Sequence, residues 1–236
     1  MTRHALLNNG DHQNLRIITR RAAELGDGVM YVPTFPFEFR AVQAHYPILF
    51  HQDASTGRFH ALAMFGFERG ENLFLTGDGW DAHYVPLAVQ RQPFLIGQDG
   101  RGERVVHIDL DSPRVSSTEG EPLFQANGAN TPYLEHIAAV LDAIHKGGEE
   151  AAAFTETLVG LGLLESLALD VELADGSKNR LMGFHVINED KLMALDSTTL
   201  ADLNARGYLA AIYMVLASLS HIRDLIVRKN ARLGGK

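Results

Sequence analysis

LALDVELADGSKNRLMGFHVI, residues Leu167 to Ile187, is the stretch that decides the fold class of this chain. Apolar and polar residues alternate on both sides of Asp175 and Gly176, and an Asp-Gly pair between alternating runs is typical of a tight β-hairpin. The stretch therefore predicts two antiparallel strands. Because helical patterns flank it, the chain must combine helices with antiparallel strands.

Upstream of the hairpin the sequence predicts two helices. Thr131 can cap the first of them and Pro132 fits its first position, and apolar residues then recur at helical spacing. Gly147 and Gly148 are expected to end this helix, because glycine is common just beyond a helix C-terminus. A second helix is then expected from Glu149 to about Leu161.

Downstream of the hairpin, Asn188 or Asp196 could start short helices, and Gly207 separates them from a long final helix. The apolar face expected on that last helix consists of Leu209, Ile212, Leu216 and Leu219. Its apolar run, Tyr208 to Leu219, is shorter than the roughly 20 residues that cross a bilayer. We therefore expect a buried core helix and no membrane span.

The first half of the chain carries short apolar or alternating runs between Gly, Asp and Pro residues, which predict strands. The expected strands are Val29 to Val32, Tyr46 to Phe50, Phe59 to Phe67, Asn72 to Leu75, Phe94 to Ile96 and Val105 to Leu110. Turn residues at Ala54 to Gly57 and Asp99 to Gly102 favour antiparallel connections, so a meander is the simplest arrangement. With no Pro-rich or Ser-rich linker, we expect one α+β domain over residues 1–236, strand-rich over 1–125 and helix-rich over 126–236.

Composition limits the functional classes. The chain has 236 residues and 46% hydrophobic content, enough for a well-filled core. Its net charge of -8 argues against nucleic-acid binding. The absence of cysteine excludes disulfides and thiolate sites, and it fits a cytoplasmic location, as does an N-terminal sequence without the apolar stretch of a secretory signal.

No motif in the sequence names a reaction. A G-x-S-x-G elbow, a Walker sequence and a G-x-G-x-x-G loop after a strand are all missing. Catalytic residues therefore stay unknown, and no cofactor is expected. One alternative comes from His51 and Asp53, whose H-x-D spacing could supply two ligands of an iron site, with His107 among the distant candidates for a third. The competing interpretation is a solvated polar edge of a strand.

The richest chemical stretch is ENLFLTGDGWDAHYVPLAVQRQPF, Glu71 to Phe94. It combines Trp80 and Tyr84, which bury large area yet keep a polar tip, with Arg91, which can hold a carboxylate at two points. Such a set could bind an anionic small molecule or a peptide. In the competing interpretation the aromatic residues close one end of the sheet, and Arg91 pairs internally with Asp81 or Asp109.

A family resemblance rests on several blocks of this sequence. They are LLNNGDHQNLRI at residues 6–17, PFEFR at 36–40, HYPILF at 45–50, GENLF at 70–74, WDAHYVP at 80–86, QRQPF at 90–94, HIDLDSPRV at 107–115 and GEPLF at 120–124. In combination they resemble the SapC-like proteins of bacteria over nearly the whole chain. The resemblance adds His12, Arg16, Glu38, Asn72 and Asp109 to the candidate ligand-binding residues.

The resemblance implies an accessory function. The family is named for an association with a bacterial surface layer, and some members are labelled as peptide transporter permeases, which the short apolar run does not favour. Related genes near flavin-dependent halogenases and outer-membrane receptors imply a part in uptake or peptide modification. We therefore expect a non-catalytic protein that recognises a peptide or an anionic small molecule, with a possible protein partner. The alternatives are an iron oxygenase and a structural homo-oligomer subunit.

Overall fold

The computed structural model describes residues 3–98 and 100–234. Helices and antiparallel strands are combined in it, so the predicted α+β class is confirmed. Its contacts divide the chain into two compact units that alternate along the sequence. Unit 1 comprises Met1–Gly28, Leu75–Asp81 and Leu87–Lys146, and unit 2 comprises Val29–Phe74, Ala82–Pro86 and Gly147–Lys236. The single domain stays a prediction.

Unit 1 is built from short strands and the first part of a long helix. Its elements are β1 (His4–Leu6), β2 (Arg16–Ile17), η1 (Ala23–Leu25), β6 (Leu75–Thr76), β7 (Gly79–Trp80), α2 (Leu87–Gln90), β8 (Phe94–Gln98), β9 (Arg104–Asp109), β10 (Val115–Ser116) and β11 (Glu121–Pro122). They form the sheets β1-β9-β8, β10-β2-β11 and β6-β7. The core of this unit places Phe94 and Ile108 of one sheet with Leu134 and Leu141 of the helix.

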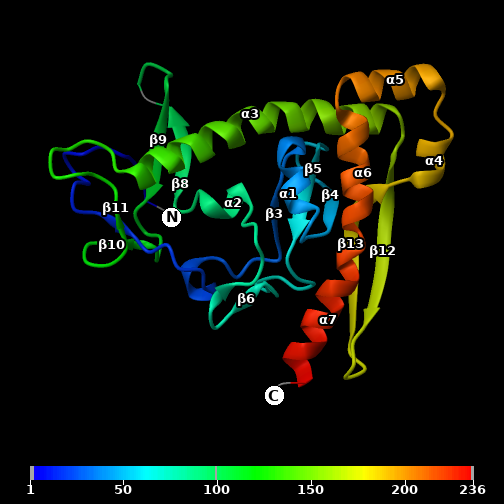
Figure 1. Ribbon diagram of the computed structural model, residues 1–236, viewed down its shortest axis with the longest axis horizontal. Helices are drawn as coiled ribbons and strands as arrows, with labels where there is room; N and C mark the ends of the chain where they lie inside the picture. Colours follow the sequence, from blue (N-terminus) through cyan, green and yellow to red (C-terminus); the bar gives the residue numbers. More distant parts are fainter. Residues whose placement is uncertain (1–2, 99, 235–236) are drawn as a thin grey trace. The chain divides into compact units, whose positions relative to one another are not determined.

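Unit 2 is built around one five-stranded sheet with the order β12-β13-β4-β5-β3. Its elements are β3 (Tyr31–Pro33), η2 (Pro36–Glu38), α1 (Phe39–Val42), β4 (Ile48–Gln52), β5 (Phe59–Met64), β12 (Leu164–Glu172), β13 (Lys178–Ile187), α4 (Glu189–Met193), α5 (Ser197–Ala205), α6 (Tyr208–Ser218) and α7 (His221–Gly234). All neighbouring strands are antiparallel. Figure 1 shows the β12–β13 hairpin as the longest strand pair.

The Asp-Gly hairpin forms where the sequence predicts it. Gly176 has a φ of 82°, and the Asp175 carboxylate accepts hydrogen bonds from the backbone N–H and the hydroxyl of Ser177 at 2.9 and 2.6 Å. The hairpin joins the main sheet, because Phe184 of β13 lies opposite His51 of β4. The second half of the chain thus supplies two strands to a sheet begun by the first.

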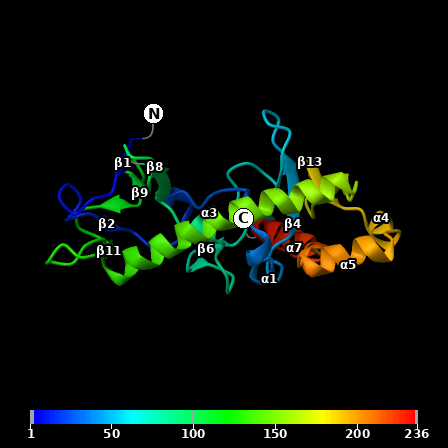
Figure 2. The ribbon, with the colours of Figure 1, turned by 90° about the horizontal axis from the view of Figure 1, so that it is seen from above.

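The two helices predicted upstream of the hairpin are one helix, α3 (Pro132–Gly160), unbroken in Figures 1 and 2. Its start is as predicted, since the Thr131 hydroxyl accepts a hydrogen bond from the N–H of Leu134 at 3.3 Å. The predicted stop at Gly147 is wrong for a packing reason. A Cβ there would lie 2.2 Å from the ring of Phe37, so the glycine lets that ring reach the helix backbone.

The helix-start signals after the hairpin are confirmed. Asn188 caps α4 by accepting from the N–H of Lys191, and Asp196 caps α5 by accepting from the N–H groups of Thr198 and Thr199. Gly207, with a φ of 75°, precedes α6. Local capping by Asn188 and Asp196 thus accounts for the starts of α4 and α5.

The predicted long final helix is two helices, α6 and α7, and its predicted apolar face is displaced. The buried residues of α6 are Tyr208, Ala211, Ile212, Val215 and Ser218, whereas Leu209, Leu216 and Leu219 are only half-buried. Ser218 anchors this stripe, because its hydroxyl accepts from the N–H of Ile48 at 2.8 Å and donates to Val215 O at 2.6 Å. A hydrogen bond from the backbone of β4 thus holds Ser218 on the inward face of α6.

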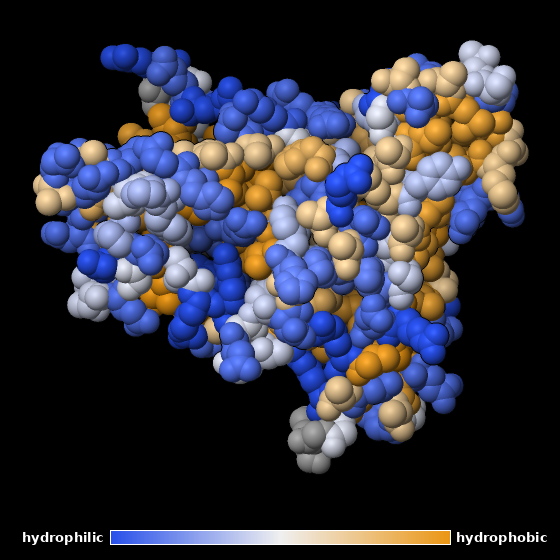
Figure 3. Space-filling view, in the orientation of Figure 1, coloured by the Kyte–Doolittle hydropathy of each residue, from blue (hydrophilic) through white to orange (hydrophobic). Residues whose placement is uncertain are grey.

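The stretch Tyr208–Gly234 is, by length and composition, the one helical segment of the described chain apolar enough to cross a membrane. An 18-residue window within it has a mean hydropathy of 1.5, and 28% of that window is buried. Figure 3 shows apolar surface over α5 and α6, and Tyr213 of α6 is 56% exposed. The absence of a span and the homo-oligomer both stay predictions.

The strand-rich half is not a meander. Its strands are shared among four sheets, and most of the predicted strand from Asn72 to Leu75 lies outside any strand. The short strands β1, β2, β10 and β11 have only two or three residues each, too few for an alternating pattern to be visible. The predicted turn from Asp99 to Gly102 begins at a residue outside the described part.

Candidate functional site

The predicted ligand-binding residues are divided between the two units. Unit 1 contains Trp80, Arg91, His12, Arg16 and Asp109, and unit 2 contains Tyr84, Asn72 and Glu38. Convergence of these residues on one pocket beside Trp80 stays a prediction. Within each unit, the candidate side chains form specific hydrogen bonds with other residues of that unit.

In unit 1 the candidates bind backbone groups. Arg16 donates to the carbonyl of Gly120 at 2.7 Å, and Arg91 donates to the carbonyl of Phe94 at 2.8 Å. His12 is buried and its Nδ1 accepts from the N–H of Asn8, while the Asp109 carboxylate accepts from the N–H of Asp111. Trp80 is half-buried on β7. Burial lowers the pKa of Arg91.

In unit 2 the candidates form a buried hydrogen-bonded group. The Glu38 carboxylate is 3% exposed and accepts from the hydroxyls of Thr34 at 2.8 Å and Tyr84 at 2.7 Å. Burial, with the charge of Glu38, raises the pKa of Tyr84, so its phenol stays a donor. The Tyr84 carbonyl in turn accepts from the hydroxyl of Tyr46. Asn72 is also buried and accepts from the N–H of Phe74.

The residues proposed for iron have other roles. Asp53 accepts from the N–H and hydroxyl groups of Ser55 and Thr56, and these bonds hold its pKa well below the usual range. His51 stacks on Tyr31 with ring centroids 6.4 Å apart. The His107 ring lies against Gly97 of the paired strand, where a Cβ would meet it at 2.4 Å. Residues 3–98 and 100–234 contain no group of three or more potential ligands able to hold a metal ion.

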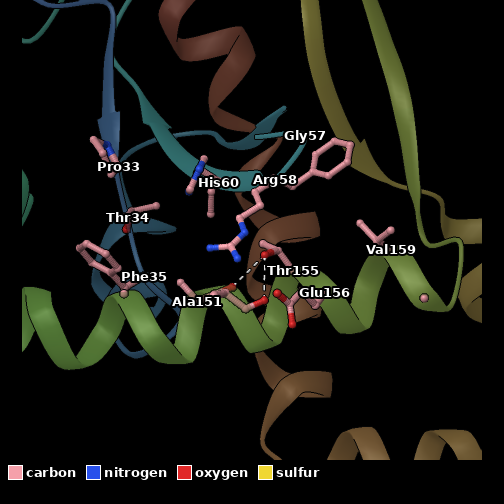
Figure 4. Close-up of a pocket in the computed structure, with 15 residues that line it drawn as sticks. Pro33, Thr34, Phe35, Gly57, Arg58, His60, Ala151, Thr155, Glu156 and Val159 are labelled. Carbon is pink, nitrogen blue, oxygen red and sulfur yellow. Dashed lines mark hydrogen bonds between the residues drawn. The ribbon is translucent and has the colours of Figure 1, made fainter. Parts of the chain in front are cut away.

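Unit 2 contains a cavity of about 480 Å³ between the second part of α3 and the strands β3 and β5 (Figure 4). Its volume lies in the range typical of small-molecule sites. The apolar and glycine lining consists of Pro33, Phe35, Gly57, Phe59, Ala61, Gly148, Ala151, Ala152, Val159 and Gly160, and the polar lining of Thr34, Arg58, His60, Thr155 and Glu156. The apolar part is therefore the larger one.

Small residues on α3 make room for this cavity. Gly148, Ala151, Ala152 and Thr155 recur at helical spacing, and a Cβ built on Gly148 meets nothing within 4 Å. The Thr155 hydroxyl bonds to the carbonyls of Ala151 and Ala152 at 3.0 and 3.1 Å. The Thr155 hydroxyl is therefore hydrogen-bonded inside the helix, and this wall of the cavity offers few hydrogen bonds to a polar ligand.

Arg58 carries the positive charge of the cavity. It follows the Asp53 turn that joins β4 to β5, and Figure 4 shows its side chain reaching toward α3 beside Thr155. Within the described residues its guanidinium forms no hydrogen bond and no ion pair, so its fork of donors is available to a ligand. The side chain is exposed, which places the charge at the mouth of the cavity.

Two further polar groups line the same cavity. His60 of β5 and Glu156 of α3 are both exposed, and neither side chain has a hydrogen-bond partner in the part of the chain that is described. Glu156 and Arg58 thus bring opposite charges to one cavity from two different elements.

A second cavity, of about 290 Å³, lies in unit 1 between β9 and the first part of α3, lined by Arg104, Asp142 and His145 among others.

The sequence interpretation missed the cavity of unit 2. A signal for it exists in GGEEAAAFTETLVG, residues 147–160, where small residues at helical spacing mark a face that cannot fill space by itself. Interpreting Gly147 and Gly148 as a helix end hid that face. For Arg58 the sequence contains no comparable signal, because only the fold brings the β4–β5 turn to α3.

The comparisons with known proteins give a family and no closer relative. The family model described as SapC matches residues 7–225 of the 236-residue chain. No curated protein and no solved structure matches the chain. The match covers nearly the whole sequence, including both units and the segments that line the cavity. This confirms the resemblance seen in the sequence blocks, and the chain therefore belongs to the SapC family.

Proposed function

We propose that this SapC protein binds a small apolar molecule that carries a carboxylate, in the cavity between α3, β3 and β5 of unit 2. The observation that carries the proposal is the Arg58 guanidinium, which is directed at a mainly apolar cavity and has no partner among the described residues. A ligand with an apolar body and one anionic group satisfies both features.

The two parts of such a ligand would be recognised by different physics. Burying apolar surface against Phe35, Ala152 and Val159 contributes roughly 25 cal/mol per Å² removed from water. The carboxylate can take two parallel hydrogen bonds from the planar guanidinium of Arg58, which fixes its orientation as well as its charge. Affinity would come mainly from the apolar body, and selection for the anion from Arg58.

The hydroxyl groups of the cavity are already engaged in hydrogen bonds within the protein. Thr155 donates to the carbonyls of its own helix, and Thr34 donates to the buried carboxylate of Glu38. Both hydroxyls therefore donate to acceptors of the protein itself, and neither is left to donate to a bound molecule. The anionic small molecule expected from the sequence is thus retained in the proposal, but its binding group becomes Arg58.

A thermal-shift assay tests the proposal with octanoate and 3-phenylpropionate, each beside the corresponding alcohol. A bound ligand raises the melting temperature by mass action. We expect the carboxylates to stabilise the protein more than the alcohols, and Arg58→Met to weaken carboxylate binding about tenfold, the lower end for a charged hydrogen bond because Arg58 is exposed.

Arg69→Met is the matched control, since Arg69 is an exposed arginine of the same unit that does not line the cavity. It should bind the carboxylates as the wild type does. Equal binding by the Arg58 and Arg69 variants, or no binding of any carboxylate by the wild type, would contradict the proposal.

A further inference from the structure

Glu156 is a feature that a site for a simple carboxylate does not explain. It lies on α3, lines the same cavity as Arg58, and is exposed without a partner in the described residues. The negative charge of Glu156 near the entrance would repel an anionic ligand.

The two charges come from opposite walls of the cavity. Arg58 projects from the β4–β5 turn and Glu156 from the helix, and Figure 4 shows the Arg58 side chain extending across the opening toward α3, which bears Glu156. They do not form an ion pair with each other, and neither pairs with another residue of ranges 3–98 and 100–234. Both groups are therefore available to a ligand that carries two opposite charges.

We infer that the ligand is a zwitterionic α-amino acid with an apolar side chain. This inference rests on the proposed function and specifies its ligand class. The carboxylate of the amino acid binds Arg58, its ammonium group lies beside Glu156, and its side chain enters the apolar part of the cavity near Phe35 and Ala152. His60, at the same opening, offers one more hydrogen-bonding group to the amino acid.

The expected selectivity is modest, because both charged side chains are exposed. An exposed ion pair changes affinity by roughly twofold to fivefold, so an amino acid should bind about that much better than the same acid without its amino group. The amine that lacks the carboxylate should bind more weakly than either, since it loses the contact with Arg58.

Isothermal titration calorimetry tests the inference with three matched sets. Leucine, phenylalanine and tryptophan are each compared with the acid that lacks the amino group and the amine that lacks the carboxylate. In the wild type we expect the order amino acid, acid, amine. In Glu156→Gln the amino acid should lose its advantage over the acid. Glu150→Gln, an exposed glutamate of the same helix that does not line the cavity, should keep the wild-type order.

The outcomes separate this inference from the proposed function. Acids that bind through Arg58 as well as or better than the amino acids would overturn the zwitterion and leave the carboxylate site standing. An amino-acid preference that survives in Glu156→Gln would overturn the role of Glu156. Failure of every acid and amino acid to bind the wild type would remove both.

Discussion

At the scale of single residues, two arginines of this chain place the same guanidinium group in opposite environments, one buried and one exposed. Arg114 is 1% exposed and donates to the Asp27 carboxylate at 2.5 Å and to the carbonyls of Ile18 and Arg20. Arg58 is exposed and has no such partner among the described residues. A buried charge must be satisfied by the fold, whereas an exposed one can be kept for a ligand.

The first prediction concerns Asp27, which has no exposed surface and also accepts from Arg21 at 3.3 Å. Asp27→Asn removes the negative charge and leaves Arg114 and Arg21 without their buried counter-ion. The free energy of unfolding should fall by about 3–5 kcal/mol, measured by urea denaturation. Arg58→Met should change it by less than about 0.5 kcal/mol. Similar losses in the free energy of unfolding of Asp27→Asn and Arg58→Met would contradict the distinction between the buried and the exposed arginine.

The second prediction concerns the hydrogen bond from Tyr84 to the buried Glu38. Tyr84→Phe removes one donor from a carboxylate that is 3% exposed, which should lower the free energy of unfolding by about 1–3 kcal/mol. Tyr31→Phe, at a more exposed tyrosine of the same unit, is the control and should be nearly neutral. If Tyr84→Phe is as stable as that control in urea, the hydrogen bond does not support the fold.

At the scale of elements, the two adjacent glycines of α3 have different roles. A Cβ on Gly147 would lie 2.2 Å from the Phe37 ring, while one on Gly148 meets nothing within 4 Å. Gly147→Ala should therefore destabilise the protein, and Gly148→Ala should stabilise it by up to about 1 kcal/mol through helix propensity. Chemical denaturation of both variants checks the signs, and a shared sign would contradict this interpretation.

Gly148 also tests whether the cavity is the binding site. Gly148→Leu places a side chain in the open space of the cavity without a clash at its Cβ. It should abolish carboxylate binding and leave the free energy of unfolding unchanged or higher. Tight carboxylate binding by a stably folded Gly148→Leu variant would show that the ligand lies elsewhere.

Elements with local signals could be predicted from the sequence, and those fixed by tertiary contacts could not. The Asp175 hairpin and the Asn188 and Asp196 caps rest on bonds between residues that are near neighbours, so the sequence pattern contains them. The continuity of α3 through Gly147 depends on packing against Phe37, far away in the sequence. The buried face of α6 likewise includes a contact between distant residues, the bond from Ile48 to Ser218.

At the scale of the molecule, two histidines of unit 2 link stability to pH. Burial lowers the pKa of His45 and of His185 below 6.5, and nearby His83, His221 and Arg228 add to the effect at His45, as His51 does at His185. The unfolded chain therefore binds protons that the folded one does not. Stability should be fully present above the ordinary histidine pKa of 6.5 and be lost as the pH falls through the lowered pKa values of His45 and His185.

Thermal melts between pH 7 and pH 5 check this prediction in the wild type and in the double variant His45→Gln, His185→Gln. The double variant should lose less stability over this interval than the wild type does. The depressed carboxylate pKa values, such as that of Asp53, act at lower pH and do not enter this window. Parallel losses in the two proteins would contradict the assignment.

The candidate site as a whole could not be predicted from the sequence, although its family could. Trp80, Tyr84 and Arg91 are close together in the chain and attract attention for their chemistry, yet Tyr84 and Arg91 bond within the protein. The cavity instead joins residues 33–35, 57–61 and 148–160, which only the order of strands and the unbroken α3 bring together. No local sequence pattern indicates that these three segments lie together.

The central claim is that the cavity of unit 2 holds the ligand. Methyl NMR of alanine-labelled protein tests it most directly, because the methyl groups of Ala151 and Ala152 line this cavity and that of Ala138 lines the smaller cavity of unit 1. On titration with 3-phenylpropionate, we expect the resonances of Ala151 and Ala152 to shift in the wild type, and in Arg58→Met to shift only at about tenfold higher ligand concentration, with Ala138 unmoved in both. Unchanged Ala151 and Ala152 resonances at saturating ligand would contradict the claim.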